Sequence, residues 1–328
     1  MISIAIPIYN EEEILHLLHS KVVEAMEDIG EDWEVVYVND GSRDKSLQIL
    51  KELQVTDPRV VVVNLSRNWG HMGALNAGLR TAKGDAVILM DGDLQDPPTV
   101  IRDMVAEWRK GAQVVNAVRR SRQESRKVLA VLFPLFYKVL GMISDYPIPL
   151  NSGIFGLIDR KALDSLNRLR EKNRYLPGLR SWVGYRTSVV YYDRQDRVGG
   201  EGKLSFVSRI KYAFDAICSF SMKPLRASFV LGGLSMIFSF ALAIAAGISA
   251  ARNGDAWIAL GGVAAIFFVG ALLLFALGML GEYIGRIYDE VRDRPLSLIN
   301  EVYRREASVR EVNGEVAAVS DFETRIAA

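Results

Sequence analysis

Two carboxylates stand one residue apart in the run Met90-Asp91-Gly92-Asp93-Leu94-Gln95-Asp96-Pro97-Pro98. An apolar run of strand length, residues 86–90, precedes them, and the side-chain amide of Gln95 follows them. Hard oxygen ligands at the carboxyl end of a buried strand can hold Mg²⁺ or Mn²⁺ against a diphosphate. In a second interpretation, Asp91 and Asp93 are turn residues and Asp96 is the N-cap of a helix. The motif alone does not decide between the two.

Strand and helix patterns alternate on both sides of this motif. Apolar runs predict strands at residues 2–8, 33–38, 60–65, 86–90 and 114–118. Apolar residues at helical spacing predict the helices between them, at residues 11–28, 44–53, 70–82 and 97–110. This alternation predicts an α/β fold with a Rossmann-like, mainly parallel sheet that helices cover on both faces.

Polar clusters follow the predicted strands, and ligands of parallel sheets bind beyond the carboxyl ends of the strands. In strand order, the clusters occupy residues 7–11, 39–42, 66–68, 91–96 and 119–120. We expect all five on one rim of the sheet, which favours the metal interpretation of Asp91 and Asp93. The sequence has neither a Gly-x-Gly-x-x-Gly after the first strand nor a P-loop, so a dinucleotide or P-loop site is disfavoured.

Composition excludes several other classes of protein. In the 328 residues, 40 Lys and Arg balance 39 Asp and Glu, which gives no support for a nucleic-acid partner. The single Cys218 rules out an internal disulfide framework, and three histidines argue against a His-based zinc site. The N-terminus reads as a strand and lacks the basic region of a signal peptide, so we expect the first domain in the cytoplasm.

Two stretches, residues 228–250 and 257–281, are almost free of charge and long enough to cross a bilayer as helices. Either could be a buried core helix, but two around a short polar turn favour a transmembrane hairpin. Lys and Arg flank the pair and only Arg252 lies in the turn, which predicts that both termini face the cytoplasm. Glycines in both spans would permit close packing of helices, including packing between subunits of a homo-oligomer.

These patterns divide the chain into four parts. We expect a soluble α/β domain at residues 1–204 and a juxtamembrane amphipathic segment at 205–226. A pair of transmembrane helices would follow at 227–284, and a cytosolic C-terminal segment with a flexible tail at 285–328.

Further runs stand in order around the Asp91 motif: Pro7-Ile8-Tyr9-Asn10-Glu11-Glu12, Val38-Asn39-Asp40-Gly41-Ser42-Arg43-Asp44, Leu65-Ser66-Arg67-Asn68-Trp69-Gly70, Leu280-Gly281-Glu282-Tyr283-Ile284-Gly285-Arg286 and Arg294-Pro295. Together they resemble the family-2 polyprenyl-phosphate glycosyltransferases of the GT-A fold, the dolichol-phosphate-mannose-synthase-like enzymes. The resemblance covers about residues 4–303 and is nearest to the bacterial branch with two C-terminal transmembrane helices. It implies a multi-pass enzyme of the bacterial inner membrane, with its catalytic domain in the cytoplasm.

The resemblance implies inverting transfer of one sugar from a nucleotide-sugar to a polyprenyl phosphate such as undecaprenyl phosphate. A UDP-sugar is the favoured donor, and GDP-mannose stays open. Asp91, Asp93 and Gln95 would hold Mg²⁺ or Mn²⁺, which stabilises the charge on the leaving nucleoside diphosphate. The nucleotide would be surrounded by Pro7, Tyr9, Asn10, Glu11, Asp40, Ser42 and Asp91. For Glu11, an acid in the first turn of a helix is the alternative.

Basic residues complete the predicted site. Arg119, Arg122 and Arg126 precede an apolar run and either clamp the acceptor phosphate or form a solvated charged face. Arg197 and Lys203 match the mobile Arg-x-x-Gly-x-Ser-Lys loop of the family, although Gly202 and Leu204 replace its usual Ser and Tyr. The predicted catalytic set is Asp93, Arg119, Arg122, Arg126, Arg197 and Lys203.

One position departs from the family pattern. Ile154, in Asn151-Ser152-Gly153-Ile154-Phe155, stands where the family usually has an Asp that faces the reaction centre. Either the chain is inactive or has a shifted substrate, or that Asp is dispensable because a phosphate monoester is already largely anionic at neutral pH. A non-catalytic membrane binding protein of the same fold is therefore the alternative function. A processive polysaccharide synthase is disfavoured, since its Gln-x-x-Arg-Trp motif is missing.

Overall fold

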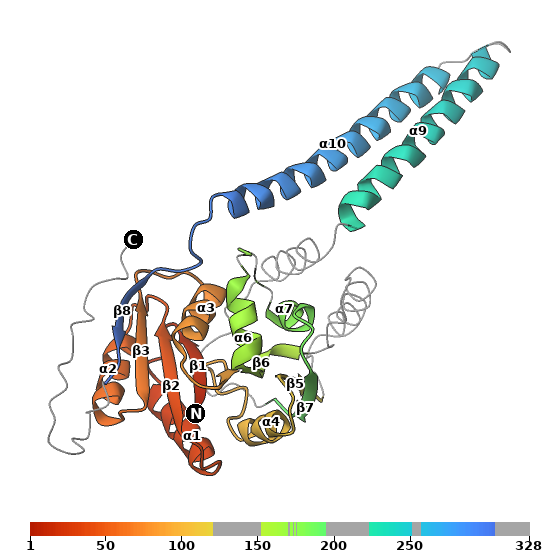
Figure 1. Ribbon diagram of the computed structural model, residues 1–328. Coiled ribbons are helices and arrows are strands. Elements are labelled where there is room, and N and C mark those ends of the chain that lie inside the picture. The colour runs from red at the N-terminus through yellow and green to blue at the C-terminus, as the bar shows by residue number, and fades with distance from the viewer. Residues whose placement is uncertain are drawn as a thin grey trace, which may run out of the picture.

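The computed structural model describes residues 1–120, 152–169, 171–172, 174, 176–194, 223–250 and 257–305. Within these ranges, an α/β domain carries two long helices that run side by side away from it (Figure 1). The last described residues return from these helices to the α/β domain, where they add a strand to its sheet.

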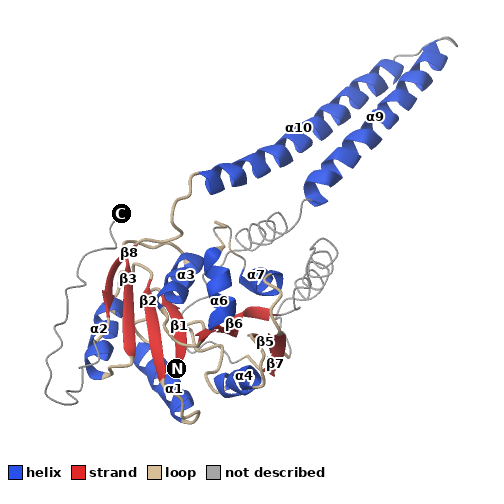
Figure 2. Cartoon of the chain, viewed as in Figure 1, coloured by secondary structure: helices blue, strands red, loops and turns tan. Residues whose placement is uncertain are grey.

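In the described ranges, eight strands form one mixed sheet: β1 (Ile2–Ile8), β2 (Trp33–Asn39), β3 (Val60–Leu65), β4 (Ala86–Leu89), β5 (Val114–Arg119), β6 (Ser152–Asp159), β7 (Thr187–Tyr192) and β8 (Ile299–Tyr303). Their order is β7-β5-β6-β4-β1-β2-β3-β8 (Figure 2). β6 and β8 run against their neighbours, and the other six strands share one direction. The prediction of a mainly parallel sheet is therefore confirmed, with its carboxyl ends on one rim.

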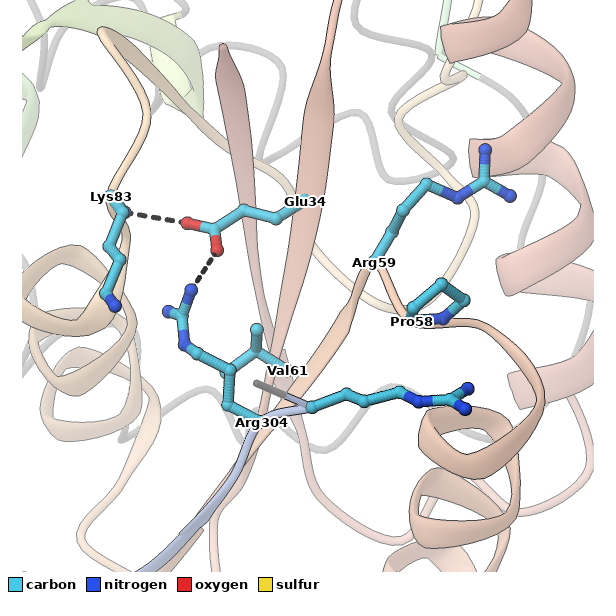
Figure 3. Close-up of a pocket in the computed structure, with 7 residues that line it drawn as sticks. Glu34, Pro58, Arg59, Val61, Lys83 and Arg304 are labelled. Carbon is cyan, nitrogen blue, oxygen red and sulfur yellow. Dashed lines mark hydrogen bonds and ion pairs between the residues drawn. The ribbon is translucent and has the colours of Figure 1, made fainter. Parts of the chain in front are cut away.

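β8 was not predicted. Its last residues are held at the end of the sheet opposite the rim, where the parallel strands begin. We call this the amino edge. There Glu34, only 5% exposed, accepts hydrogen bonds from Ser3 Oγ (2.7 Å), Lys83 N (2.7 Å) and Arg304 Nη1 (2.6 Å). Figure 3 shows the contacts with Lys83 and Arg304. A cavity of about 340 Å³ opens beside this group, with Arg59 and Arg305 in its lining. The ion pair joins Arg304, which follows β8, to Glu34 of β2 on the far side of β3.

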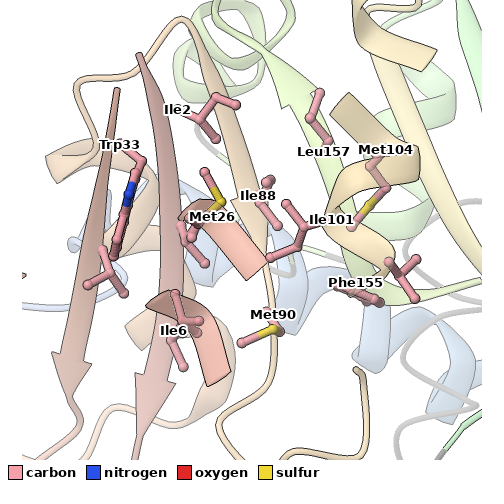
Figure 4. Packing of buried hydrophobic residues seen from close by; sticks show 14 of the residues in the cluster. Ile2, Ile6, Met26, Trp33, Ile88, Met90, Ile101, Met104, Phe155 and Leu157 are labelled. Atoms are coloured by element: carbon pink, nitrogen blue, oxygen red, sulfur yellow. The ribbon is translucent and has the colours of Figure 1, made fainter. Parts of the chain in front are cut away.

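Helices cover both faces of the sheet because successive strand residues point to opposite sides. Ile2, Ile4 and Ile6 of β1 are fully buried on the face covered by α1 (Leu15–Glu27), α2 (Ser46–Thr56) and α4 (Val100–Arg109) (Figure 4). Ala5 faces the other side, which is covered by α3 (His71–Thr81), α6 (Arg160–Arg168) and α7 (Leu176–Trp182). Each fully buried Ile contributes about 1.5–3 kcal/mol, and together they fix the strand ends that carry the polar clusters.

The two long helices are α9 (Lys223–Ala250) and α10 (Trp257–Val291). They pack together through an edge-to-face contact of Phe238 and Phe268, whose ring centroids lie 5.7 Å apart. Among the described residues, one segment, Ala265–Val291, is long and apolar enough to cross a membrane, and an 18-residue window within it has a mean hydropathy of 2.1. The apolar stretch of α9, Leu231–Ala241, is shorter. The hairpin is present, but its crossing of a membrane as two spans stays a prediction.

Candidate active site

The rim brings the ends of β1, β2 and β3 together through backbone contacts. Asp40, which is 3% exposed, donates its N–H to the carbonyl of Ile8 (2.9 Å) and accepts from Trp69 N at Oδ1 (2.7 Å). Burial raises the pKa of Asp40, although the N–H groups of Trp69 and Gly70 and the charge of His71 oppose this rise. The Asp40 carboxylate is thus held in place at an electrostatic cost.

The loops after β1 and β2 interlock. Asn10 donates its N–H to Ser42 Oγ (3.1 Å) and accepts from Arg43 N at Oδ1 (2.8 Å), and Glu11 N donates to Ser46 Oγ (3.0 Å). Asn10 has a left-handed backbone, with φ of 53°, which Asn tolerates better than most residues. These bonds bring three of the predicted nucleotide residues, Asn10, Glu11 and Ser42, into one group.

Gly41 explains why the β2 loop can approach the β3 loop so closely. Its φ of +64° lies in the left-handed region, and a Cβ there would lie 2.5 Å from the backbone N of Asn68. Only glycine meets both demands.

The loop of Asp91 and Asp93 lies directly against β1. A Cβ on Gly92 would lie 2.8 Å from Ile8 Cδ1 and 3.2 Å from the carbonyl oxygen of Pro7, so this position needs glycine. Leu94 has φ of 56°, which a Leu rarely adopts, but its side chain is 5% exposed and packs in the core. Core packing therefore sets the direction of the loop.

His71, at the start of α3, contacts this loop through its Nε2, which lies 2.9 Å from Asp91 Oδ1. Burial alone would raise the pKa of Asp91, but the hydrogen bond and charge of His71, with the charges of Arg119 and Arg194, lower it overall. Asp91 is therefore ionised at neutral pH. The sequence offered no signal for this His71 contact.

The residues of this loop fit a divalent cation held jointly with a substrate. Asp91 and Asp93 supply carboxylates, and Gln95 supplies a side-chain amide. The backbone N–H of Gln95 donates to Asp93 Oδ1 (3.2 Å). The described part of the chain has no group of three His, Cys, Asp or Glu side chains placed to hold a metal. Mg²⁺ usually takes one or two carboxylates together with substrate phosphates, so this small donor set is of the expected kind.

Asp96 is not an N-cap, because α4 begins four residues later at Val100 and its N-cap position is Thr99. Its carboxylate is 1% exposed and turns instead toward β5 and β7. Asp96 Oδ1 accepts from the Tyr192 hydroxyl (2.5 Å), and Arg119 Nη2 lies 3.6 Å from it. The predicted site residue Arg119 is thus joined to the metal loop, through two residues whose part the sequence did not reveal.

The remaining predicted residues divide into two groups. Arg122, Arg126, Arg197 and Lys203 lie outside the described residues, as do the apolar run after Arg126, the amphipathic segment and the C-terminal tail. Ile154 lies near the start of β6 and packs, partly buried, against the apolar cluster beneath α3, α6 and α7. Its surroundings are those of an apolar contact, and its side chain supplies no proton acceptor.

The chain is similar to known proteins over most of its length. A family model described as Glycosyl transferase family 2 matches residues 3–166. An uncharacterized glycosyltransferase, YkcC, from Bacillus subtilis (strain 168) is 39% identical over 92% of this chain and 94% of its own length. A protein named bactoprenol glucosyl transferase from Shigella phage SfII is 38% identical over 92% of this chain and 98% of its own.

Similarity to solved structures is weaker. The crystal structure of mannosyl-3-phosphoglycerate synthase from Rubrobacter xylanophilus is 18% identical, covers 67% of this chain and 72% of its own, and gives a TM-score of 0.44. At this level the likeness adds nothing about ligands.

Proposed function

Because the chain belongs to glycosyl transferase family 2, it is a glycosyltransferase, and we propose that it transfers one sugar from a nucleotide-sugar to a polyprenyl phosphate. The relative named bactoprenol glucosyl transferase supports a polyprenyl lipid as the acceptor. Undecaprenyl phosphate is the specific acceptor that we propose, with a UDP-sugar as the favoured donor. The product would be a lipid-linked sugar phosphate, used for glycans or lipids of the cell envelope.

The observation that carries the proposal is the short connection between α10 and the rim. Only residues 292–298 separate the end of α10 from the start of β8. This connecting segment spans at most about 25 Å when fully extended. The carbonyl of Leu298 accepts from Ser66 N (3.0 Å) at the carboxyl end of β3. The rim therefore lies close to the segment that leaves the long apolar helix, where a lipid phosphate would be presented.

A membrane around α9 and α10 would cover a large apolar surface. Exposed side chains on these helices include Met236, Ile237, Phe240, Ile266, Phe267 and Leu274. A soluble monomer rarely exposes so extended an apolar patch. We propose that both helices cross the bacterial inner membrane, with the catalytic domain and both termini in the cytoplasm. Packing between subunits through these helices stays a prediction.

In the proposed reaction, an oxygen of the acceptor phosphate attacks the anomeric carbon in line, and the nucleoside diphosphate leaves. Asp91, Asp93 and Gln95 would hold Mg²⁺ or Mn²⁺, which when bound supplies charge stabilisation to the leaving diphosphate. Asp40 and the loop of Asn10 would hold the nucleoside. The second pKa of a phosphate monoester is about 6, so the acceptor is already an anion at neutral pH and Ile154 is no obstacle.

The test uses the full chain in detergent with undecaprenyl phosphate and a panel of radiolabelled nucleotide-sugars, with and without Mn²⁺. We expect one donor to transfer label to the lipid phase, in a reaction that Asp93→Ala abolishes. The matched control is Asp103→Ala, which removes an exposed carboxylate from α4. Full activity in Asp93→Ala would contradict the metal assignment. Nucleotide binding without transfer from any donor would support a non-catalytic binding protein, the alternative that Ile154 suggests.

A further inference from the structure

We propose that Arg194 is a second phosphate-binding residue beside Arg119, and that the buried pair of Asp96 and Tyr192 positions both guanidinium groups. The phosphoryl nature of the ligand rests on the proposed function. The phosphate belongs either to the donor diphosphate or to the acceptor monoester, and the experiment below separates the two.

The pairing of β5 with β7 brings these residues together. The two strands are parallel, and Arg119 stands opposite Tyr192 in their register. Arg119 Nε donates to the Tyr192 hydroxyl (3.1 Å). Arg194 follows Tyr192 by two residues, and its Nε lies 3.9 Å from Asp96 Oδ1. Both arginines therefore reach the same carboxylate from neighbouring strand ends.

Asp96 cannot neutralise both arginines. Its carboxylate faces two guanidinium groups, 3.6 Å and 3.9 Å from Oδ1, and the charge of Asp91 also acts on both arginines. The side chains of Arg119 and Arg194 are 18% and 33% exposed, so both keep donors open to solvent. A guanidinium has five N–H donors, and phosphate oxygens match their geometry.

Tyr192 fixes the position of Arg119 relative to Asp96. Its hydroxyl accepts from Arg119 Nε, which can only donate, and gives its single proton to Asp96 Oδ1. Its ring is 4% exposed and packs edge-on against Phe155, with ring centroids 5.5 Å apart at 84°. The hydroxyl is thus a rigid bridge between the carboxylate and the guanidinium.

Arg119 and Arg194 lie next to the proposed binding site of the reacting phosphates. Asp96 is the next residue after Gln95 of the metal loop, and Arg119 Nη2 lies 3.5 Å from the place a Cβ would take on Gly153, beside Ile154. The guanidinium of Arg119 therefore lies between Asp96 and the start of β6, and Arg194 reaches the same carboxylate.

The test measures equilibrium binding of two probes to the full chain in detergent: UDP with Mn²⁺, and undecaprenyl phosphate. We expect Arg194→Gln to weaken binding of one probe by about 10- to 100-fold, as expected for loss of a charge-assisted hydrogen bond, and Arg119→Gln to weaken the same probe. Arg194→Lys should recover part of the loss. The matched control is Arg120→Gln, because Arg120 pairs at 3.3 Å with the exposed Asp193.

The positioning role has its own readout. Tyr192→Phe keeps the ring and removes the hydroxyl, and we expect it to weaken the same probe about 3- to 10-fold, in line with loss of one hydrogen bond. Combined with Arg119→Gln, it should add little further, since both changes break one bridge. Fully additive losses of binding would show that Tyr192 does not act through Arg119.

The outcomes are distinct. A loss confined to UDP assigns the two arginines to the donor diphosphate, and a loss confined to undecaprenyl phosphate assigns them to the acceptor. If Arg194→Gln binds every probe that the unmodified chain binds, with unchanged affinity, the inference is wrong. An unmodified chain that binds UDP but transfers no sugar would contradict the proposed function and leave this binding test intact.

Discussion

The two edges of the sheet use the carboxylates of Glu34 and Asp91 in opposite ways. At the amino edge, Glu34 is 5% exposed and accepts from a hydroxyl, a backbone N–H and the guanidinium of Arg304. At the rim, the side chain of Asp91 is 28% exposed and contacts His71. The amino edge completes its own hydrogen bonds and serves the fold. The rim keeps carboxylate surface open, which a ligand can complete.

Backbone conformation separates the two edges as well. Of the three described non-glycine residues with positive φ, two, Asn10 and Leu94, lie on the rim. A left-handed Leu costs about 1–2 kcal/mol, which burial of its side chain offsets. Unfavourable conformations held by surrounding packing are typical of functional sites. Four predictions test this division of labour between the edges.

The largest effect is expected for Asp91→Asn at the rim. It removes one negative charge from the proposed metal site, and we expect kcat to fall about 1,000-fold or more, equal to about 4 kcal/mol of transition-state stabilisation. The free energy of unfolding should change by less than about 1 kcal/mol, because Asp91 is partly exposed. Transfer assays and urea unfolding of the same preparation measure both. Activity within tenfold of the unmodified chain would remove Asp91 from the site.

The next effect is expected at the amino edge, for Glu34→Ala. It leaves Arg304, Ser3 and the Lys83 N–H without their acceptor, and we expect unfolding to become easier by about 3–4 kcal/mol. The kcat of the folded fraction should not change. Adding Arg304→Ala should cost less than the sum of the two changes. The control is Glu24→Ala, whose exposed pair with Lys21 contributes less than about 1 kcal/mol. A loss of kcat in folded Glu34→Ala would show that the amino edge affects catalysis at the rim, contrary to this prediction.

The sequence predicted which residues lie on the rim, but it did not predict the contacts at the amino edge. Continuous apolar runs marked five of the six parallel strands, and each of these runs ended in its own polar cluster, so Asp40 and Asp91 could be assigned to one rim. β8 is largely exposed and pairs with a strand more than 200 residues away, so its local sequence carried little signal. The Arg304 contact with Glu34 depends on that pairing.

Within the rim, the sequence failed where tertiary packing decides. Asp96 before two prolines is a helix-start pattern, but the helix begins at Val100 and the carboxylate is drawn to Tyr192 on β7. His71 meets Asp91 only because α3 packs on β1, which is the neighbour of β4 in the sheet. Neither contact is encoded in a local motif, since both partners come from elements that pair after folding.

A smaller effect concerns acid stability at the amino edge. Burial acts to raise the pKa of Asp57, but its hydrogen bonds with Arg59 outweigh burial and lower it overall. A carboxyl whose pKa is lowered in the folded state stabilises the protein above its unfolded pKa, about 3.9, and loses this contribution as the pH falls through the folded value. Asp57→Asn should cost about 1–2 kcal/mol at pH 7 and flatten the decline in stability below about pH 4. Urea unfolding from pH 7 to pH 3 measures it, and an unchanged pH profile would contradict it.

The smallest expected effect is at Asp40 on the rim, where the change of stability with pH has the opposite sign to that of Asp57. Because burial raises the pKa of Asp40, the folded state disfavours its ionised form, and stability should increase as the pH falls through that raised pKa. Asp40→Asn keeps an oxygen for Trp69 N and removes the charge, so we expect unfolding at pH 7 to become harder by up to about 1 kcal/mol. Nucleotide binding, measured by calorimetry with UDP, should weaken at the same time. A variant that is less stable and binds UDP normally would make Asp40 a structural residue like Glu34, and the contrast between the two edges would then begin only at Asp91.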